Sequence, residues 1–209
     1  MDRVLTRPLE GLRTALVAPL ARRLPQWVTP NRLTVLRLTL TVPLAFFLLQ
    51  QAWWPALIVY LVAVLTDAVD GELARVRNDT SLLGARLDPS VDKVLHLVLY
   101  VTFLPASPIL LTLLIVLDVL LFLVGLLTVV ARKQPASIAG ASIYGKWKFL
   151  VQTLSIVLLF STRLAPHATI SVALPSVLVL AIVFAVLSMV GYLQQLFGAW
   201  NRHPAETAP

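Results

Sequence analysis

The sequence predicts an all-α integral membrane protein with six transmembrane helices, preceded by an N-terminal amphipathic helix that lies at the membrane interface. Hydrophobic residues make up 58% of the 209 residues and charged residues only 13%, whereas soluble domains are nearer half apolar and more heavily charged. The mean hydropathy is +0.86. Long apolar stretches recur along the whole chain, as in proteins that cross a bilayer several times.

Residues 1–26 are predicted to form the amphipathic juxtamembrane helix. Leucines recur every three or four positions from Leu5 to Leu24, and arginines lie mostly between them. A helix that is apolar on one face and basic on the other suits an anionic membrane surface. The alternative is a frayed basic tail. Several arginines and prolines precede the first long apolar run, which argues against a secretory signal.

Six apolar segments follow, and each is long enough to span a bilayer as a helix. We place them at residues 32–50, 54–77, 82–104, 109–131, 144–162 and 170–198. They form one predicted six-helix transmembrane domain over residues 27–203, and residues 204–209 are predicted to be a disordered tail. The chain has no cysteine, which excludes disulfides and thiolate metal ligands.

The basic residues are distributed asymmetrically along the predicted spans. Nearly every Lys and Arg falls in the N-terminal segment, the 75–93 region, the 132–148 region or the C-terminus, and Arg163 alone falls on the opposite side. The positive-inside rule then places both termini in the cytoplasm. In a membrane protein the net charge of +7 reflects this topology and anionic lipid rather than nucleic acid. We therefore expect a multi-pass protein of a bacterial-type inner membrane, with membrane lipids and no nucleic acid among its partners.

Four aspartates stand at the inner ends of the second and third predicted spans: Asp67, Asp70, Asp88 and Asp92. Carboxylates near lipid are costly and usually functional. Each pair shares one helix face, and the short connection between the spans makes them antiparallel neighbours, so all four carboxylates can converge on the cytoplasmic side. Their repulsion requires protonation or cations between them. Oxygen ligands favour Mg²⁺ or Mn²⁺, and a carboxylate-bridged pair of such ions suits attack on a phosphoryl centre.

The aspartates belong to a longer pattern over residues 67–92. It reads Asp-x-x-Asp-Gly-x-x-Ala-Arg, then eight residues, Gly, three residues, Asp, three residues and Asp. This pattern resembles the CDP-alcohol phosphotransferase family at every fixed position. Residues 29–37 are similar to the segment that begins the family's first helix. The resemblance extends to chain length, the six spans and the N-terminal helix, so it covers nearly the whole chain.

The resemblance implies an enzyme that transfers a phosphatidyl group from CDP-diacylglycerol to a small alcohol and releases CMP. It implies two divalent cations, Mg²⁺ or Mn²⁺, bridged by Asp67 and Asp88, with Asp70 completing one site and Asp92 the other. Asp92 is also the implied general base. The residues that match the nucleotide and CDP-lipid contacts are Asn31, Thr34, Gly71, Ala74, Arg75, Ser81 and Gly84. The resemblance further implies a homodimer.

The acceptor alcohol is predicted from residues outside this pattern. Residues 88–95 and 144–153 resemble the bacterial phosphatidylglycerophosphate synthase branch of the family, which implies glycerol 3-phosphate as the acceptor. An anionic acceptor needs positively charged side chains to bind it. The candidates are Lys146, which we favour, Lys148 and Arg132. For Arg132, the topology of the protein in the membrane explains the positive charge equally well. That branch usually carries an Arg-Glu pair midway along the fourth span, where this chain has Asp118 and no arginine. The same chemistry with inositol phosphate, serine or phosphatidylglycerol is therefore the alternative.

The sequence also supports expectations about two further residues, Asp118 and His96, and about two other classes of function. Asp118 is expected to line the pocket or to pair with Lys93 or an arginine, and His96 is expected to be a satisfied interior group. A divalent-cation transporter is the alternative from another class, but it would need polar residues across both membrane halves, and the outer halves are almost wholly apolar. A catalytically inactive scaffold is disfavoured because it would retain four costly carboxylates for no purpose.

Overall fold

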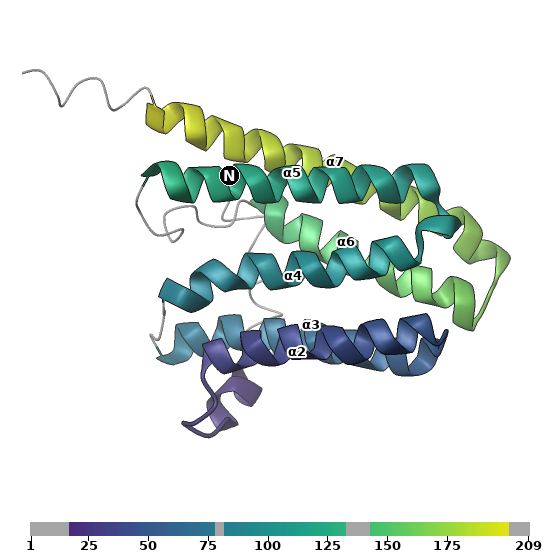
Figure 1. The fold of residues 1–209 in the computed structure, drawn as a ribbon, viewed down its shortest axis with the longest axis horizontal. Helices are drawn as coiled ribbons and strands as arrows, with labels where there is room; N and C mark the ends of the chain where they lie inside the picture. Colours follow the sequence, from purple (N-terminus) through teal and green to yellow (C-terminus); the bar gives the residue numbers. More distant parts are fainter. Residues whose placement is uncertain (1–16, 78–81, 133–142, 201–209) are drawn as a thin grey trace, which may run out of the picture. The chain divides into compact units, whose positions relative to one another are not determined.

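The computed structural model describes residues 17–77, 82–132 and 143–200, so most of the predicted juxtamembrane helix and the whole predicted tail lie outside it. The described residues are helical and include no strand (Figure 1). The six predicted segments coincide with the six long helices: α2 (Pro30–Leu49), α3 (Trp53–Arg77), α4 (Leu82–Thr102), α5 (Pro108–Arg132), α6 (Ile143–Leu164) and α7 (Ala168–Trp200). A short 3₁₀ helix, η1 (Leu104–Ala106), lies between α4 and α5.

Three helices in the described part of the chain are long and apolar enough to cross a membrane. They are Pro30–Leu49, Tyr144–Leu164 and Ala168–Gly191, and α5 adds a shorter apolar stretch, Pro108–Val124. The prediction of an all-helical membrane protein is thus confirmed at this level, while the six-span arrangement stays a prediction.

The side chains are distributed as in a membrane protein. Large apolar side chains face outward, with Leu49 84% and Val172 75% exposed. Charged side chains are buried instead, among them Arg37, Asp70 and Asp118. A soluble protein would expose its charges and bury its apolar groups, so this inverted arrangement fits a multi-pass protein whose surface meets lipid.

The chain divides into two compact units, and the first contains α2, α3 and α4. Thr29 caps α2, because its Oγ1 accepts a hydrogen bond from the Arg32 backbone N–H at 3.4 Å. After α2 the chain reverses through Gln51, whose φ of 54° is in the left-handed region. The reversal places α3 alongside α2, and α2 packs against both α3 and α4 (Figure 1). The helix that carries Arg37 is therefore adjacent to both helices that carry the aspartates.

The segment before α2 is held against the end of α3. Ala21 and Val28 pack on Leu73 of α3 in one buried cluster. Arg77, the last residue of α3, donates from Nη1 to the Val28 carbonyl at 2.6 Å and from Nη2 to the Leu24 carbonyl at 2.8 Å. It also reaches the carbonyls of Pro25 at 3.0 Å and Gln26 at 3.4 Å. This single guanidinium thus fixes the approach to the N-terminus of α2.

We expect Arg77→Met to lower the Tm by about 5 °C, because a charged hydrogen-bond donor contributes about 1.5–3 kcal/mol and two of its four contacts are exposed to water. Arg77→Lys should recover less than half of this loss, since an ammonium group cannot reproduce the forked geometry. Thermal unfolding of the purified protein measures both, with Arg23→Gln as the control at an exposed arginine. An unchanged Tm for Arg77→Met would show that these contacts are not needed for stability.

The second unit contains η1, α5, α7 and most of α6. α5 packs against α7. The rings of Phe103 and Phe160 meet edge to face with centroids 5.2 Å apart, and Trp147 stacks on Phe184 with centroids 6.2 Å apart. Aromatic pairs of this kind add to the stabilisation from burial alone.

Candidate active site

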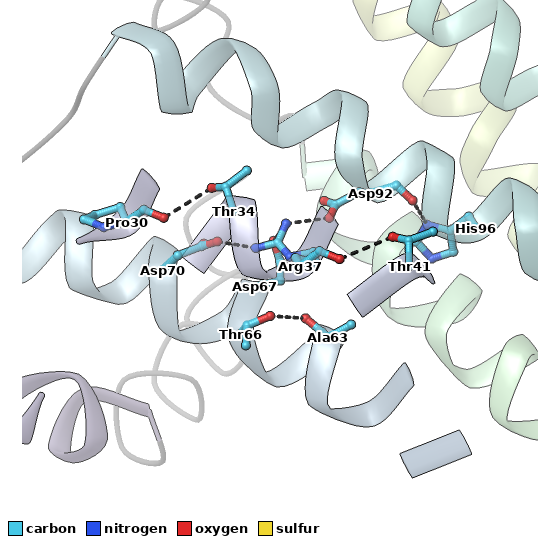
Figure 2. Close-up of polar contacts among 10 residues, drawn as sticks. All are labelled: Pro30, Thr34, Arg37, Thr41, Ala63, Thr66, Asp67, Asp70, Asp92 and His96. Atoms are coloured by element: carbon cyan, nitrogen blue, oxygen red, sulfur yellow. Dashed lines mark hydrogen bonds and ion pairs between the residues drawn. The ribbon is translucent and has the colours of Figure 1, made fainter. Parts of the chain in front are cut away.

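Three of the four predicted aspartates converge on one arginine within the first unit (Figure 2). Arg37 Nη1 lies 2.9 Å from Asp67 Oδ1 and 2.6 Å from Asp92 Oδ1. Arg37 Nη2 pairs with Asp70 Oδ2. Asp67 and Asp70 come from α3 and Asp92 from α4, so the arginine of α2 joins the two acidic helices. The predicted convergence of the aspartates is therefore seen for these three.

The helical periods of α2 and α3 explain why these groups meet. The buried residues of α2 are Thr34, Arg37, Thr41, Leu44 and Leu48. Their spacing of three and four residues defines a single inward stripe, which is polar in its first half and apolar in its second. Asp67 and Asp70 are three residues apart and share one face of α3.

Burial makes the cluster strongly interacting. The side chains of Arg37 and Asp70 are 1% and 4% exposed, while those of Asp67 and Asp92 are about one quarter exposed. Buried opposite charges attract more strongly than exposed ones because little water screens them. The two less buried carboxylates are the ones open enough to meet a ligand.

His96 supports the backbone at Asp92. Its Nδ1 lies 2.8 Å from the Asp92 carbonyl oxygen, one helical turn away (Figure 2). A carbonyl oxygen only accepts hydrogen bonds, so Nδ1 carries the proton in this contact. The imidazole is buried, as expected for an interior group.

The predicted nucleotide residues lie on the same three helices wherever the structure describes them. Asn31 is half-buried in the first turn of α2. Thr34 is buried, and its hydroxyl donates to the Pro30 carbonyl at 3.3 Å. Gly71 and Ala74 are half-buried on α3, just beyond Asp70.

The remaining members of the predicted pattern are only partly described. Arg75 belongs to α3, and Gly84 and Asp88 belong to α4, but their surroundings lie outside the description. Ser81 lies outside the described residues altogether. The fourth carboxylate of the predicted quartet thus stays a prediction.

The predicted acceptor residues belong to the second unit. Lys148 of α6 is engaged by Asp118 of α5, with Nζ 2.5 Å from Oδ1. Gln152, one turn further along α6, donates from Nε2 to Asp118 Oδ2 at 2.9 Å. Lys146 is half-buried on α6, and Arg132 is the last residue of α5, with its side chain outside the description.

The structure gives Asp118 two partners that the sequence did not predict. Its carboxylate pairs with Lys148 and Gln152. Lys148 and Gln152 are four residues apart, so both project from one face of α6 toward the same carboxylate. The sequence analysis considered Lys148 as a candidate for binding the acceptor phosphate and not as a partner of Asp118.

Sequence reasoning also missed Arg37 as a site residue. The available signal was an arginine at the sixth position of a predicted span, followed by no charged residue before Asp67. Ionisable groups at such positions are functional candidates by default.

The donor set suits hard divalent cations. Asp67, Asp70 and Asp92 supply only oxygen donors, which Mg²⁺ and Mn²⁺ prefer, and all three already contact a positive group. Among the described residues, no three acidic, histidine or cysteine side chains form a ready-made metal group. The guanidinium lies between the carboxylates and contacts all three, so a metal-bound arrangement requires these contacts to change.

Comparison with known proteins places the chain in one group of enzymes. The model of the CDP-alcohol phosphatidyltransferase family matches residues 27–190, which include α2 to α6 and most of α7. The chain is similar to the CDP-diacylglycerol–glycerol-3-phosphate 3-phosphatidyltransferase of Cereibacter sphaeroides, with 35% identity over 142 residues, or 64% of this chain and 63% of that protein. No solved structure matches the chain significantly.

Two further relatives are named for two different enzymes. A protein of Aquifex aeolicus, also named CDP-diacylglycerol–glycerol-3-phosphate 3-phosphatidyltransferase, is 32% identical over 132 residues, or 61% of this chain and 72% of that protein. The CMP-forming cardiolipin synthase of Rattus norvegicus is 40% identical over 93 residues, or 43% of this chain and 31% of that protein. The chain thus spans less than two thirds of the Cereibacter and rat relatives.

Proposed function

Because the chain belongs to the CDP-alcohol phosphatidyltransferase family, we propose that it transfers a phosphatidyl group from CDP-diacylglycerol to an alcohol and releases CMP. The observation that carries this proposal is the convergence of Asp67, Asp70 and Asp92, from two neighbouring helices, on one buried positive charge. Phosphoryl transfer assisted by metal ions needs a group of carboxylates that binds the cations. The apolar helices around it would keep the acyl chains of the donor in lipid.

The proposed cofactors are two divalent cations, Mg²⁺ or Mn²⁺, held by Asp67, Asp70, Asp88 and Asp92. When bound, such ions polarise the phosphoryl oxygens and neutralise the charge that develops on the leaving group. The carboxylates would hold the ions through oxygen atoms, and those of Asp67, Asp70 and Asp92 now contact Arg37. Arg75, one turn beyond Gly71, would add a forked donor for the diphosphate.

The proposed chemistry assigns the proton transfer to Asp92. Its carboxylate takes the proton of the acceptor hydroxyl, the alcohol oxygen forms a bond to the phosphorus attached to the lipid, and the bond to the CMP oxygen breaks. The 27% exposure of the Asp92 side chain leaves it open to an incoming alcohol. His96 would keep the backbone of Asp92 in place through the contact with its carbonyl.

The remaining motif residues would bind the nucleotide and the diphosphate. Small residues let the substrate approach the backbone of α3 and α4, and hydroxyl and amide side chains supply hydrogen bonds. The proposed set is Asn31, Thr34, Gly71, Ala74, Arg75, Ser81 and Gly84. The short α2–α3 reversal and the packing of α4 on α2 support this assignment, because they gather the three helices that carry these residues.

Glycerol 3-phosphate is the proposed acceptor. Two relatives carry it in their names, and an anionic acceptor requires positive side chains. Lys146 is the favoured candidate for binding the acceptor phosphate. Lys148, which pairs with Asp118, and Arg132 are the other candidates. The rat relative is named a cardiolipin synthase, which makes a lipid alcohol such as phosphatidylglycerol the second candidate.

The proposed arrangement in the membrane follows from charge. The basic residues gather near the ends of the helices that carry the aspartates, so both termini and the active site would face the cytoplasm of a bacterial-type cell. All six long helices would span the bilayer, with residues 1–26 at its surface. The protein would act as a homodimer.

The decisive experiment follows CMP release by the purified protein with CDP-diacylglycerol and a panel of alcohols. We expect turnover with glycerol 3-phosphate in Mg²⁺ or Mn²⁺ and at least a 100-fold loss in excess chelator, restored by adding the metal back. The panel also contains inositol phosphate, serine and phosphatidylglycerol. If no alcohol leads to CMP release, the proposed enzymatic activity is refuted. If CMP is released only with an alcohol other than glycerol 3-phosphate, only the proposed identity of the acceptor is refuted.

A further inference from the structure

Arg37 occupies the centre of the candidate metal site. Its side chain is 1% exposed and, among the described residues, contacts the carboxylates of Asp67, Asp70 and Asp92 from two helices (Figure 2). Nη1 serves both Asp67 and Asp92, while Nη2 serves Asp70. A residue that only marked the membrane boundary would direct its charge toward water. This arginine instead directs it into the acidic cluster.

We propose that Arg37 is a built-in counter-ion that holds the acidic cluster together without metal and competes with divalent cations for the same carboxylate oxygens. The inference rests on the proposed metal site and adds a residue to which neither the sequence pattern nor the relatives' names assign a role. It explains how Asp67, Asp70 and Asp92 can be buried together before a cation arrives. Three carboxylates in that position without a counter-charge would be strongly unfavourable.

Formal charges support the competition. The three described carboxylates and Arg37 together leave two negative charges, and Asp88 adds a third. Two divalent cations would more than neutralise these charges and leave one positive charge in the site. Once both metal ions were bound, the carboxylates would no longer need the guanidinium as a counter-charge. The guanidinium would then lie where an anionic diphosphate needs a hydrogen-bond donor. A buried arginine can be retained there only if such an anion replaces its lost partners.

The geometry makes the competition direct. A carboxylate oxygen that accepts a short hydrogen bond from a guanidinium donates less electron density to a metal ion. Asp67 and Asp92 each present one oxygen to Nη1, so cation binding must lengthen or break these contacts. By thermodynamic linkage, an interaction that metal binding weakens must itself weaken metal binding. Removing the guanidinium should therefore tighten cation binding while it destabilises the metal-free protein.

The test measures Mn²⁺ binding by isothermal titration calorimetry and Tm by thermal unfolding, on the full chain in lipid nanodiscs without nucleotide. The variants are Arg37→Met and Arg37→Lys, with Arg23→Gln, an exposed arginine outside the cluster, as the control. We expect Arg37→Met to bind Mn²⁺ at least about tenfold more tightly than the wild type. Its Tm should fall by about 10 °C in chelator and largely recover in saturating Mn²⁺.

Arg37→Lys keeps the charge but loses the fork, so it should fall between Arg37→Met and the wild type. Equal or weaker Mn²⁺ binding by folded Arg37→Met would overturn the inference. If Arg37→Met does not fold even with Mn²⁺, Arg37→Lys decides: tighter binding than the wild type supports the competition, and unchanged binding refutes it. A wild type that binds no Mn²⁺ refutes the proposed metal site itself, whereas identical binding by all proteins refutes only the role of Arg37.

Discussion

Asp92→Asn is expected to lower CMP release by about 1000-fold or more. General-base catalysis contributes about 10²–10⁴-fold, and the amide that replaces the carboxylate cannot take a proton at neutral pH. The substitution keeps the size of the side chain, and its amide oxygen can still accept the hydrogen bond from Arg37. CDP-lipid binding should therefore largely survive. Single-turnover CMP release and a nucleotide-binding titration measure the two quantities separately.

Asp70→Asn provides the matched comparison for this experiment. Asp70 is almost fully buried and is not open to an incoming alcohol, so its loss should weaken metal binding as well as turnover. A loss of turnover in Asp92→Asn with CDP-lipid binding intact identifies Asp92 as the base. Near-normal turnover, or a loss of binding as large as the loss of turnover, would remove that role from Asp92.

Lys148→Met is expected to destabilise the protein by about 3–5 kcal/mol, which lowers the Tm by about 10 °C. Among the described residues, the substitution leaves the buried Asp118 carboxylate with Gln152 as its remaining partner. An unpaired buried charge is far more costly than the pair is stabilising. Thermal unfolding measures the shift, with Arg23→Gln as the surface control.

The double variant Asp118→Leu with Lys148→Met tests the reason for this loss. It replaces both charges by apolar groups, so it should be more stable than Lys148→Met alone. Asp118→Asn should cost less than Lys148→Met, because the amide oxygen still accepts hydrogen bonds. A double variant as unstable as the sum of its single variants would show that the two side chains act independently.

Local properties of the chain account for the success of the helix prediction. α3 was predicted over residues 54–77 and spans Trp53–Arg77, because the apolar run and the break around Asn78 depend only on neighbouring residues. The same is true of α2, whose Thr29 cap and Pro30 lie at the predicted entry to the first helix. The membrane-spanning character of α3 and α4 is less directly readable, since carboxylates and basic residues interrupt their apolar runs.

The candidate site was predictable where it depends on periodicity. Asp67 and Asp70 share a face because they are three residues apart, and the short α3–α4 connection predicted their approach to Asp92. The contact of these carboxylates with the Arg37 guanidinium was not predictable in this way. Arg37 and Asp70 are 33 residues apart, and nothing local to α2 indicates which helix its buried stripe will meet.

By itself, the sequence determined that this protein is helical, membrane-embedded and equipped with a carboxylate cluster suited to phosphoryl transfer. These properties follow from hydrophobic length, helical period and residue spacing, which act within one or two helices. Only the tertiary structure decided that Arg37 contacts the carboxylates of the cluster and that Asp118 pairs with Lys148. A buried charge accepts whichever opposite charge the packing brings within hydrogen-bond distance, and that choice depends on how whole helices meet.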